Sequence, residues 1–236
     1  MSESKNMNSG PFHAPYIRDD ETVERLGPFY FIQKKKGHRL TSDSVLLSEF
    51  IPDITDHSRI IDIGAGTGAI PLLIAGRSQA AITAVDVEPG ACDTANRNFE
   101  ANNLTGRCKI INSDYRSLPD IYPAGAFDIV VSNPPYTKKG TGRPSPCKER
   151  QMARSEVLGG LSDLVAVSRY LAGDNGRIFY VFPVARLFEM IREVKKARLA
   201  VVRLRFVHFD CTKAARLFLI EIALQGTLNI EAPMFV

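Results

Sequence analysis

The sequence has no C-x-x-C pair of cysteines, no cluster of histidines and no long hydrophobic run. Structural zinc sites bring Cys and His together at short, regular spacings, so we expect no metal site. No apolar stretch reaches the ~18–20 residues of a membrane-crossing helix, and the polar N-terminus has no signal-peptide core. We therefore expect a soluble, cytoplasmic protein with reduced thiols. The four scattered cysteines are Cys92, Cys108, Cys147 and Cys211.

A strong excess of one charge is also missing, because 30 basic and 26 acidic side chains give a net charge of +4. The charge is uneven. Residues 1–26 hold three basic and five acidic side chains, a balance of −2, which leaves +6 for the remainder. Basic clusters at residues 34–39 and 138–154 flank the two motifs described below. A charged run is commonly a solvated face, but this placement favours a nucleic-acid partner.

Hydrophobic residues make up 44% of the chain, and from residue 59 onward apolar strands alternate with helices. The expected strands are 59–64, 80–87, 108–114, 127–133, 176–183, 199–209 and 215–224. The expected helices are 68–77, 89–103, 155–172 and 184–198. This alternation predicts an α/β fold with a mostly parallel, seven-stranded sheet and helices on both faces. The last two strands have no helix between them, which predicts an antiparallel edge hairpin.

The domain organisation follows from the same pattern. We expect residues 1–26 to form a polar, disordered tail and residues 27–236 to form one domain. Within it, a strand and a helix in residues 27–58 would form a lid, and residues 59–225 would form the core.

The stretch IIDIGAGTGAIPLL lies at a strand–helix junction, where open α/β sheets bind ligands. Gly64, Gly66 and Gly68 allow a tight turn and a close approach of a ligand to the backbone. The G-x-G-x-G spacing differs from the G-x-G-x-x-G of dinucleotide-binding domains, and no Lys-Ser/Thr follows as in a phosphate loop. A purely structural βα turn is the alternative. Asp62 precedes the glycines and could meet an ammonium group.

Acidic residues also end the next two expected strands. Asp86 comes 18 residues after Gly68, where Rossmann-type sites bind a ribose diol, and Glu88 is a competing candidate. Asp114 ends the following strand. Three acidic residues with one glycine loop suit a nucleoside that carries a positively charged amino-acid tail.

The order of these features resembles the class I S-adenosylmethionine-dependent methyltransferases, a family with a Rossmann-like fold, over residues 59–225. The resemblance implies that Asp62 and the three glycines bind S-adenosylmethionine. It also implies that Asp86 binds the ribose and that Asp114 approaches the adenine.

Asn133-Pro134-Pro135-Tyr136 follows the fourth expected strand of the core. It resembles the (Asn/Asp)-Pro-Pro-(Tyr/Phe/Trp) motif of methyltransferases that act on planar amino groups. Such an amine is a poor nucleophile because its lone pair is delocalised. Asn133 Oδ1 and the carbonyl of Pro134 can accept its two N–H bonds, and proline's fixed φ sets the direction of that carbonyl. Tyr136 offers a face for stacking. A rigid turn is the alternative.

The stretch GHRLTSDSVLL, residues 37–47, resembles a G-x-R-x-x-x-D-x-x-L-L motif of bacterial tRNA (adenine-N6)-methyltransferases of the valine-tRNA type. The resemblance implies that Arg39 and Asp43 lie beside the cofactor. Release-factor glutamine methyltransferases carry a helical N-terminal domain that residues 1–36 do not resemble. DNA adenine methyltransferases carry a target-recognition domain, for which no segment of this sequence is long enough. Both families are therefore less favoured than the tRNA enzymes.

The basic segment after Tyr136 is broken by glycine and proline, and we expect a mobile loop that contacts RNA phosphates. The predicted substrate-binding residues are Pro135, Lys138, Lys139 and Arg143. A wider RNA-binding face could include Arg203, Arg205, Lys213 and Arg216, although alternating arginines are commonly the solvated side of a strand.

These features predict an S-adenosylmethionine-dependent N-methyltransferase that modifies N6 of an adenine in RNA, with tRNA as the favoured substrate. A protein glutamine or an rRNA base amine is the alternative acceptor. A catalytically silent cofactor- and RNA-binding subunit and a dinucleotide oxidoreductase are rival interpretations. The sequence leaves the oligomeric state open between monomer and homodimer.

Overall fold

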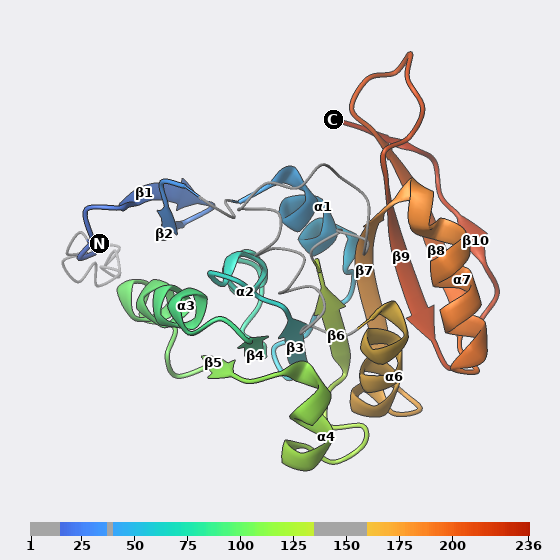
Figure 1. The fold of residues 1–236 in the computed structure, drawn as a ribbon, viewed down its shortest axis with the longest axis horizontal. Helices are drawn as coiled ribbons and strands as arrows, with labels where there is room; N and C mark the ends of the chain where they lie inside the picture. Colours follow the sequence, from blue (N-terminus) through green and yellow to red (C-terminus); the bar gives the residue numbers. More distant parts are fainter. Residues whose placement is uncertain (1–14, 37–39, 135–159) are drawn as a thin grey trace, which may run out of the picture.

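The computed structural model of the protein describes residues 15–36, 40–134 and 160–236 (Figure 1). The strands are β1 (Glu21–Leu26), β2 (Phe29–Lys34), β3 (Arg59–Ile63), β4 (Ala81–Asp86), β5 (Cys108–Asn112), β6 (Ile129–Ser132), β7 (Arg177–Pro183), β8 (Ala200–His208), β9 (Leu217–Ala223), β10 (Asn229–Ile230) and β11 (Met234–Phe235). The helices are α1 (Ser42–Phe50), α2 (Ala69–Ala75), α3 (Pro89–Ala101), α4 (Leu118–Ile121), α6 (Leu161–Ala172) and α7 (Leu187–Lys196), with short 3-10 helices η1 (Tyr115–Ser117) and η2 (Val184–Arg186).

The larger sheet has nine strands in the order β10–β8–β9–β7–β6–β3–β4–β5, with β11 also paired to β8. Strands β3 to β7 are parallel to one another, and β9 runs antiparallel to both β7 and β8. The predicted α/β fold, with its mostly parallel sheet and antiparallel hairpin, is confirmed. The sheet has two strands more than the seven predicted, because the short β10 and β11 add in parallel to β8.

Apolar side chains cover both faces of this sheet. On one face α1, α2 and α3 pack on the strands through residues that include Leu47 and Phe99. On the other face α4, α6 and α7 pack through residues that include Leu118, Leu171 and Met190. The central strands are therefore buried on both sides, which is why they are continuous apolar runs in the sequence.

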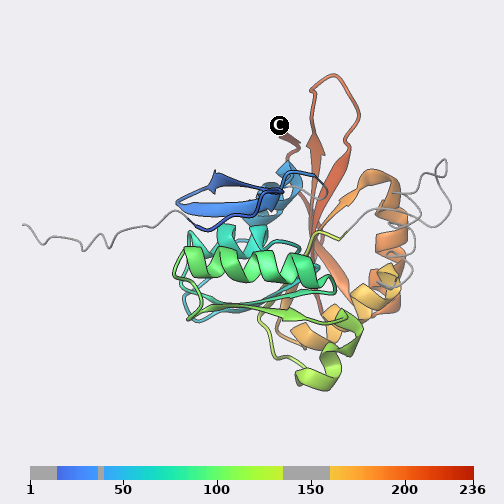
Figure 2. The same ribbon diagram turned by 60° about the vertical axis from the view of Figure 1, so that its left-hand side comes forward.

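The N-terminal region departs from the predicted tail. β1 pairs antiparallel with β2 along its whole length, and Figure 2 shows this hairpin lying against α3. Glu21 is buried at the start of β1, where Arg97 of α3 binds both of its carboxylate oxygens. Pairing with a cation makes this burial tolerable, whereas the sequence ETVERL alone looks solvent-exposed. The prediction of a disordered tail is therefore wrong for residues 21–26; residues 1–14 lie outside the described part of the chain.

Two predicted boundaries are also corrected. Gly160 has an extended backbone (φ −91°, ψ 175°) and caps α6, so no single helix runs through residues 155–172. Asp163 Oδ2 accepts a hydrogen bond from Gly160 N at 3.0 Å, which begins the helix at Leu161. At the other end, β10 and β11 carry the sheet past residue 225, the predicted end of the core.

Candidate active site

The carboxyl ends of the parallel strands meet at one edge of the sheet, which we call the ligand edge. Gly64 follows β3, Asp86 ends β4, Asp114 lies two residues beyond β5, and Asn133 follows β6. Open α/β sheets bind their ligands at this edge. The fold thus brings together predicted residues that lie up to 69 positions apart, since the separation of Gly64 and Asn133 is 133 − 64.

The glycine turn between β3 and α2 is held against the end of β4. Gly64 N and Ala65 N donate to Val85 O at 2.8 and 3.0 Å, and Gly66 N donates to Asp86 Oδ2 at 2.8 Å. Gly64 and Gly66 have φ values of +75° and +55°, and a Cβ at either would meet no heavy atom of the described residues within 4 Å. Both positions therefore combine a backbone that favours glycine with an open surface for a ligand.

Gly68 has a different reason to be glycine. Its φ is +84°, and a Cβ there would lie 3.0 Å from the ring of Phe99 on α3. It begins α2 and lets this helix pack closely on α3. The structure thus gives Gly68 a packing role, in addition to the cofactor contact that the sequence predicts for all three glycines.

Asp62 in β3 is fully buried, and neither of its carboxylate oxygens has a hydrogen-bond partner among the described residues. Burial raises the pKa of Asp62 well above its ordinary value, and the nearby charge of Asp86 raises it further. An ionised carboxylate in such a position is costly unless a cation or a hydrogen-bond donor meets it. A ligand with an ammonium group would supply both.

Asp86 and Asp114 lie in different electrostatic surroundings. Burial raises the pKa of Asp86, although its carboxylate accepts hydrogen bonds from Gly66 N and from Glu88 N, the latter at 2.9 Å. The carboxylate of Asp114 is bound by Arg116, whose hydrogen bonds lower the pKa of Asp114. A ligand that approaches Asp114 therefore meets an ion pair, whereas one that approaches Asp86 meets a partly buried carboxylate.

The amide of Asn133 is placed by α1. Asn133 Nδ2 donates to Ser44 Oγ at 3.1 Å, and the preceding Ser132 Oγ donates to Ile63 O at 2.6 Å. The second bond joins the end of β6 to the end of β3, and the first joins the amide of Asn133 to the start of α1. Asp43, the neighbour of Ser44, is half-buried in the first turn of α1. Ser44 lies within the GHRLTSDSVLL motif, but nothing in the sequence distinguishes it from other polar residues at a helix start.

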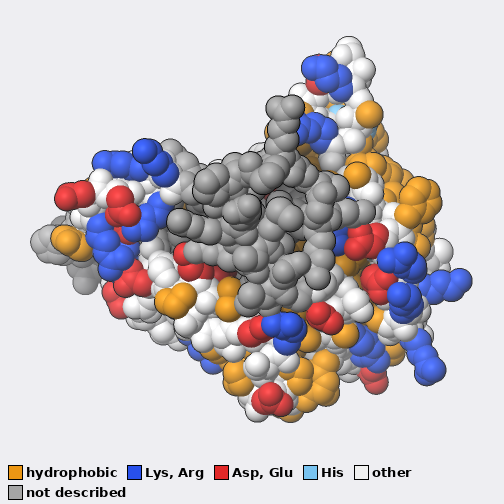
Figure 3. Space-filling view, in the orientation of Figure 1, with side chains coloured by type: hydrophobic (Ala, Val, Ile, Leu, Met, Phe, Trp, Pro, Cys, Tyr) orange, Lys and Arg blue, Asp and Glu red, His pale blue; other side chains and the backbone are white. Residues whose placement is uncertain are grey.

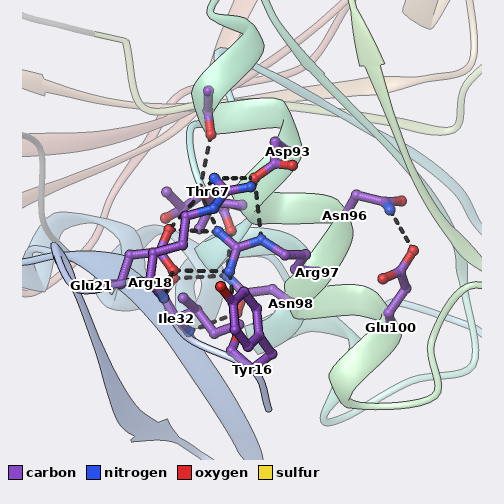
Figure 4. A network of polar contacts seen from close by, with 12 residues as sticks. Tyr16, Arg18, Glu21, Ile32, Thr67, Asp93, Asn96, Arg97, Asn98 and Glu100 are labelled. Atoms are coloured by element: carbon purple, nitrogen blue, oxygen red, sulfur yellow. Dashed lines mark hydrogen bonds and ion pairs between the residues drawn. The ribbon is translucent and has the colours of Figure 1, made fainter.

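Behind the glycine turn, Asn98 of α3 connects three segments (Figure 4). It accepts from Ile32 N at 2.7 Å and donates to Ile32 O and Thr67 O at 3.0 and 2.9 Å. One turn later, Asn102 makes the same pair of bonds with the backbone of Tyr30. The two asparagines thus bind the edge of β2 as a neighbouring strand would. Sequence reasoning missed both, because a buried asparagine in a helix does not reveal its partners.

Six predicted site residues lie outside the described part of the chain, together with the predicted mobile loop. They are Arg39, Pro135, Tyr136, Lys138, Lys139 and Arg143. Pro134 is described and is half-buried directly after Asn133.

S-adenosylmethionine, the predicted cofactor, fits the donor set at the ligand edge. The carboxylate of Asp62, which has no hydrogen-bond partner in the described part of the chain, can bind the ammonium group, and Gly64 and Gly66 leave room beside the backbone. Asp86 has carboxylate oxygens that can accept hydrogen bonds from a ribose diol. A groove of about 340 Å³, lined by residues that include Arg59, lies at the opposite edge, among the beginnings of the strands, and contains none of these groups.

The described residues contain no group of three or more His, Cys, Asp or Glu side chains that could hold a metal ion. None of their helices has the length and apolar composition needed to cross a membrane.

Known proteins resemble this chain in sequence. Residues 38–152 match the family model described as the Methyltransferase small domain. The tRNA1(Val) (adenine(37)-N6)-methyltransferase of Shewanella sp. (strain MR-4) is 32% identical over 181 residues, which cover 76% of this chain and 75% of that protein. The chain belongs to this methyltransferase family. A protein of the same name from Flavobacteriaceae bacterium (strain 3519-10) is 26% identical over 215 residues, 90% of this chain and 88% of that protein.

Membership confirms the predicted enzyme class, and the matched range contains the glycine turn, Asp86, Asp114 and Asn133. A solved structure of a predicted O-methyltransferase from Agrobacterium tumefaciens superposes with a TM-score of 0.66 at 19% identity, covering 82% of this chain and 86% of that one. At this identity the likeness shows the fold alone, and it confirms the Rossmann-like methyltransferase fold expected from the sequence.

Proposed function

We propose that this methyltransferase transfers the methyl group of S-adenosylmethionine to N6 of an adenine in tRNA, with adenine 37 of a valine tRNA as the specific target. The names and coverage of the two relatives support this substrate. The observation that carries the proposal is the contact of Asn133 with Ser44, because it fixes an amide acceptor at the ligand edge. A tRNA substrate implies action in the cytoplasm.

The residues at the ligand edge divide into two groups with different tasks. Asp62, Gly64, Gly66 and Asp86 hold the cofactor, whose sulfonium supplies an already activated methyl group. Asp114 contributes on the adenine side of the cofactor, beside its ion pair with Arg116. Arg39 and Asp43 complete this group from the segment around the start of α1.

The second group handles the target amine. Asn133 Oδ1 and the carbonyl of Pro134 accept the two N–H bonds, which helps the nitrogen become pyramidal and directs its lone pair. Tyr136 stacks on the base, and Pro135, Lys138, Lys139 and Arg143 bind the surrounding RNA. When bound, S-adenosylmethionine would supply the methyl group to this nitrogen, which would give up one of its two protons. No covalent enzyme intermediate is required. The correct orientation of the reactants therefore provides most of the rate acceleration and can lower the activation barrier by up to ~7–11 kcal/mol.

The test is methyl transfer from labelled S-adenosylmethionine to undermodified bulk tRNA, ribosomal RNA and total protein in parallel. The labelled products are digested and identified by mass spectrometry. The expected result is N6-methyladenosine from tRNA, with loss of turnover but unchanged cofactor affinity in Asn133→Ala. Label in a protein glutamine or an rRNA base would show that the proposed tRNA substrate is wrong and would identify the substrate class. Absence of any transfer by a protein that still binds the cofactor would favour the silent-subunit interpretation.

A further inference from the structure

The β8–β9 hairpin ends at the ligand edge. β9 is antiparallel to β7 and to β8, so β8 runs in the direction of β7 and ends on the side where β3 to β7 end. Figure 1 shows the connection between β8 and β9 projecting beyond the rest of the sheet on this side. We call this projection, residues 208–216 together with β11 (Met234–Phe235), the hairpin arm. β11 belongs to it because Phe235 pairs with His208.

Basic side chains are exposed on the hairpin arm, as Figure 3 shows. The side chain of Lys213 is 76% exposed, with its ammonium group 2.9 Å from Asp210. Arg216 is exposed and has no ion pair among the described residues, and its guanidinium lies 5.5 Å from the ring centroid of Phe209. Such groups are available to RNA phosphates and raise affinity by releasing counterions.

Aromatic rings accompany these charges. Phe235 is 58% exposed, and its ring centroid lies 5.3 Å from that of His208. Val236 N donates to His208 O at 3.0 Å, which holds the end of the chain beside β8. Single-stranded RNA is recognised by stacking of unpaired bases on aromatic rings together with cationic contacts to the backbone. The hairpin arm offers both at the edge where a target base must enter.

Two arginines of β8 that precede the hairpin arm, Arg203 and Arg205, are bound by acidic residues. Arg203 binds Glu221 and Glu231, and its guanidinium also donates to Phe50 O at 2.7 Å. Arg205 binds Glu231. Arg203 thus connects the sheet to α1, and Arg205 is paired with Glu231. Of the four basic residues that the sequence suggested for a wider RNA-binding face, we therefore retain Lys213 and Arg216.

We propose that the hairpin arm binds the single-stranded loop of the RNA substrate beside the target adenine. Lys213 and Arg216 contact its phosphates, and Phe235, supported by His208, stacks on an unpaired base. The inference rests on the proposed function, because it assumes that the nucleotide to be methylated reaches the ligand edge from an RNA loop.

The experiment compares two double variants with the same change of charge. Lys213→Glu/Arg216→Glu alters the hairpin arm. Lys109→Glu/Lys195→Glu alters exposed lysines at the start of β5 and near the end of α7, which lie at the opposite edge. Binding of an unmodified valine tRNA transcript is measured by fluorescence anisotropy over a range of salt concentrations, with S-adenosylhomocysteine present. Calorimetry with S-adenosylmethionine checks that both variants keep the cofactor site.

The arm variant should bind the transcript at least about tenfold more weakly, the scale of one lost charge-assisted hydrogen bond. Its slope of log affinity against log salt should be shallower by about 1.4–1.8, as expected for two lost phosphate contacts. The matched control should keep the wild-type slope. A third variant, Phe235→Ala, should lose about fivefold or more in affinity with the slope unchanged, since stacking is not ionic.

Wild-type affinity and slope in the arm variant, or an equal loss in the control, would overturn the proposal; a hairpin arm that serves a protein partner predicts the first of these results. The two proposals fail separately. If the wild-type protein binds the transcript through the hairpin arm but never methylates it, the proposed methyl transfer is refuted and RNA binding by the arm is supported. If the protein methylates the transcript and the arm variant binds normally, RNA binding by the arm is refuted and the proposed methyl transfer is supported.

Discussion

A buried carboxylate that has no hydrogen-bond partner among the described residues gives the ligand edge its chemical character. Asp62 is 0% exposed, Asp86 is partly buried nearby, and burial raises the pKa of each. Two carboxyl groups with raised pKa values favour a positively charged ligand, because its arrival stabilises both charges. A pyrophosphate would meet repulsion at the same place, which argues against the dinucleotide oxidoreductase.

Replacing Asp62 with asparagine should separate stability from binding. The folded pKa of Asp62 lies above the ordinary value of 3.8, so the folded state holds its proton at pH values where the unfolded chain has lost it. The cofactor-free protein therefore loses stability as the pH rises from that value through the folded pKa. Asp62→Asn should remove this loss and unfold at a higher temperature at neutral pH, because a neutral amide costs less to bury than a charge.

The same variant should bind S-adenosylmethionine about 1.5–3 kcal/mol more weakly, the range for hydrogen bonds to charged groups. Thermal unfolding over a pH series and calorimetry measure the two effects. Unchanged cofactor affinity would show that the ammonium group binds elsewhere.

Ser44 is a positioning residue for the acceptor amide. Ser44→Ala removes the oxygen that accepts from Asn133 Nδ2, so the amide can rotate and kcat should fall by about tenfold or more, since small misplacements of a reacting group are costly. The dissociation constant for S-adenosylmethionine should stay unchanged. Ser44→Thr keeps the hydroxyl and should restore turnover, and Ser42→Ala, at an exposed position of the same helix, should behave as wild type. A wild-type kcat in Ser44→Ala would remove this role.

At the level of elements, α3 holds the glycine turn and the N-terminal hairpin in one arrangement. Its Asn98 satisfies a backbone N–H and two carbonyls that lie in segments far apart in sequence. Buried backbone groups that lose their partner cost about 1–3 kcal/mol each. The helix thus transmits any loosening of β2 to the turn that faces the cofactor.

Asn98→Ala should therefore lower the free energy of unfolding by roughly 2–4 kcal/mol, because three backbone groups lose their partner and relaxation recovers part of the cost. It should also weaken cofactor binding, since Thr67 belongs to the glycine turn. Asn96→Ala is the matched control on the same helix, because Asn96 is exposed and its side chain bonds to Glu100 alone among the residues that the structure describes. Chemical denaturation should show a change within about 0.5 kcal/mol for the control. Equal effects of the two substitutions would contradict the connecting role of Asn98.

The elements also explain how far the sequence could predict this structure. β3, β4 and β6 were predictable because strands buried on both faces are continuous apolar runs, and their ends then located Asp62, Asp86 and Asn133. β1 was not predictable in this way, because its burial depends on the ion pair between Glu21 and Arg97, which lie 76 positions apart in the sequence. Ser44 and Asn98 were missed for the same reason: their importance comes from partners that only the folded chain brings near.

At the scale of the whole molecule, hairpins from the two ends of the chain lie on either side of the ligand edge (Figure 1). β1 and β2 pack on α3 beside the glycine turn, and β8 and β9 extend beyond β7. Ion pairs help to attach the N-terminal hairpin to the rest of the protein. Glu21 has a fully buried side chain bound by Arg97, and Lys34 and Arg18 lie 3.4 and 4.0 Å from its carboxylate.

Acid should therefore loosen this attachment. Hydrogen bonds from Arg97 lower the pKa of Glu21 from 4.5 to about 2. A depressed pKa contributes stability that is fully present above the unfolded value and is lost as the pH falls from about 4.5 to about 2.

Glu21→Gln should lower the free energy of unfolding at pH 7 by roughly 2–4 kcal/mol, the scale of breaking a buried, hydrogen-bonded charge pair. It should also reduce the fall in the free energy of unfolding that acid causes in the wild-type protein, which we call the acid limb. Glu24→Gln, at an exposed position of β1, should leave this fall unchanged. Denaturation midpoints at a series of pH values measure both effects, and an acid limb in Glu21→Gln as steep as in wild type would assign the acid sensitivity to other carboxylates.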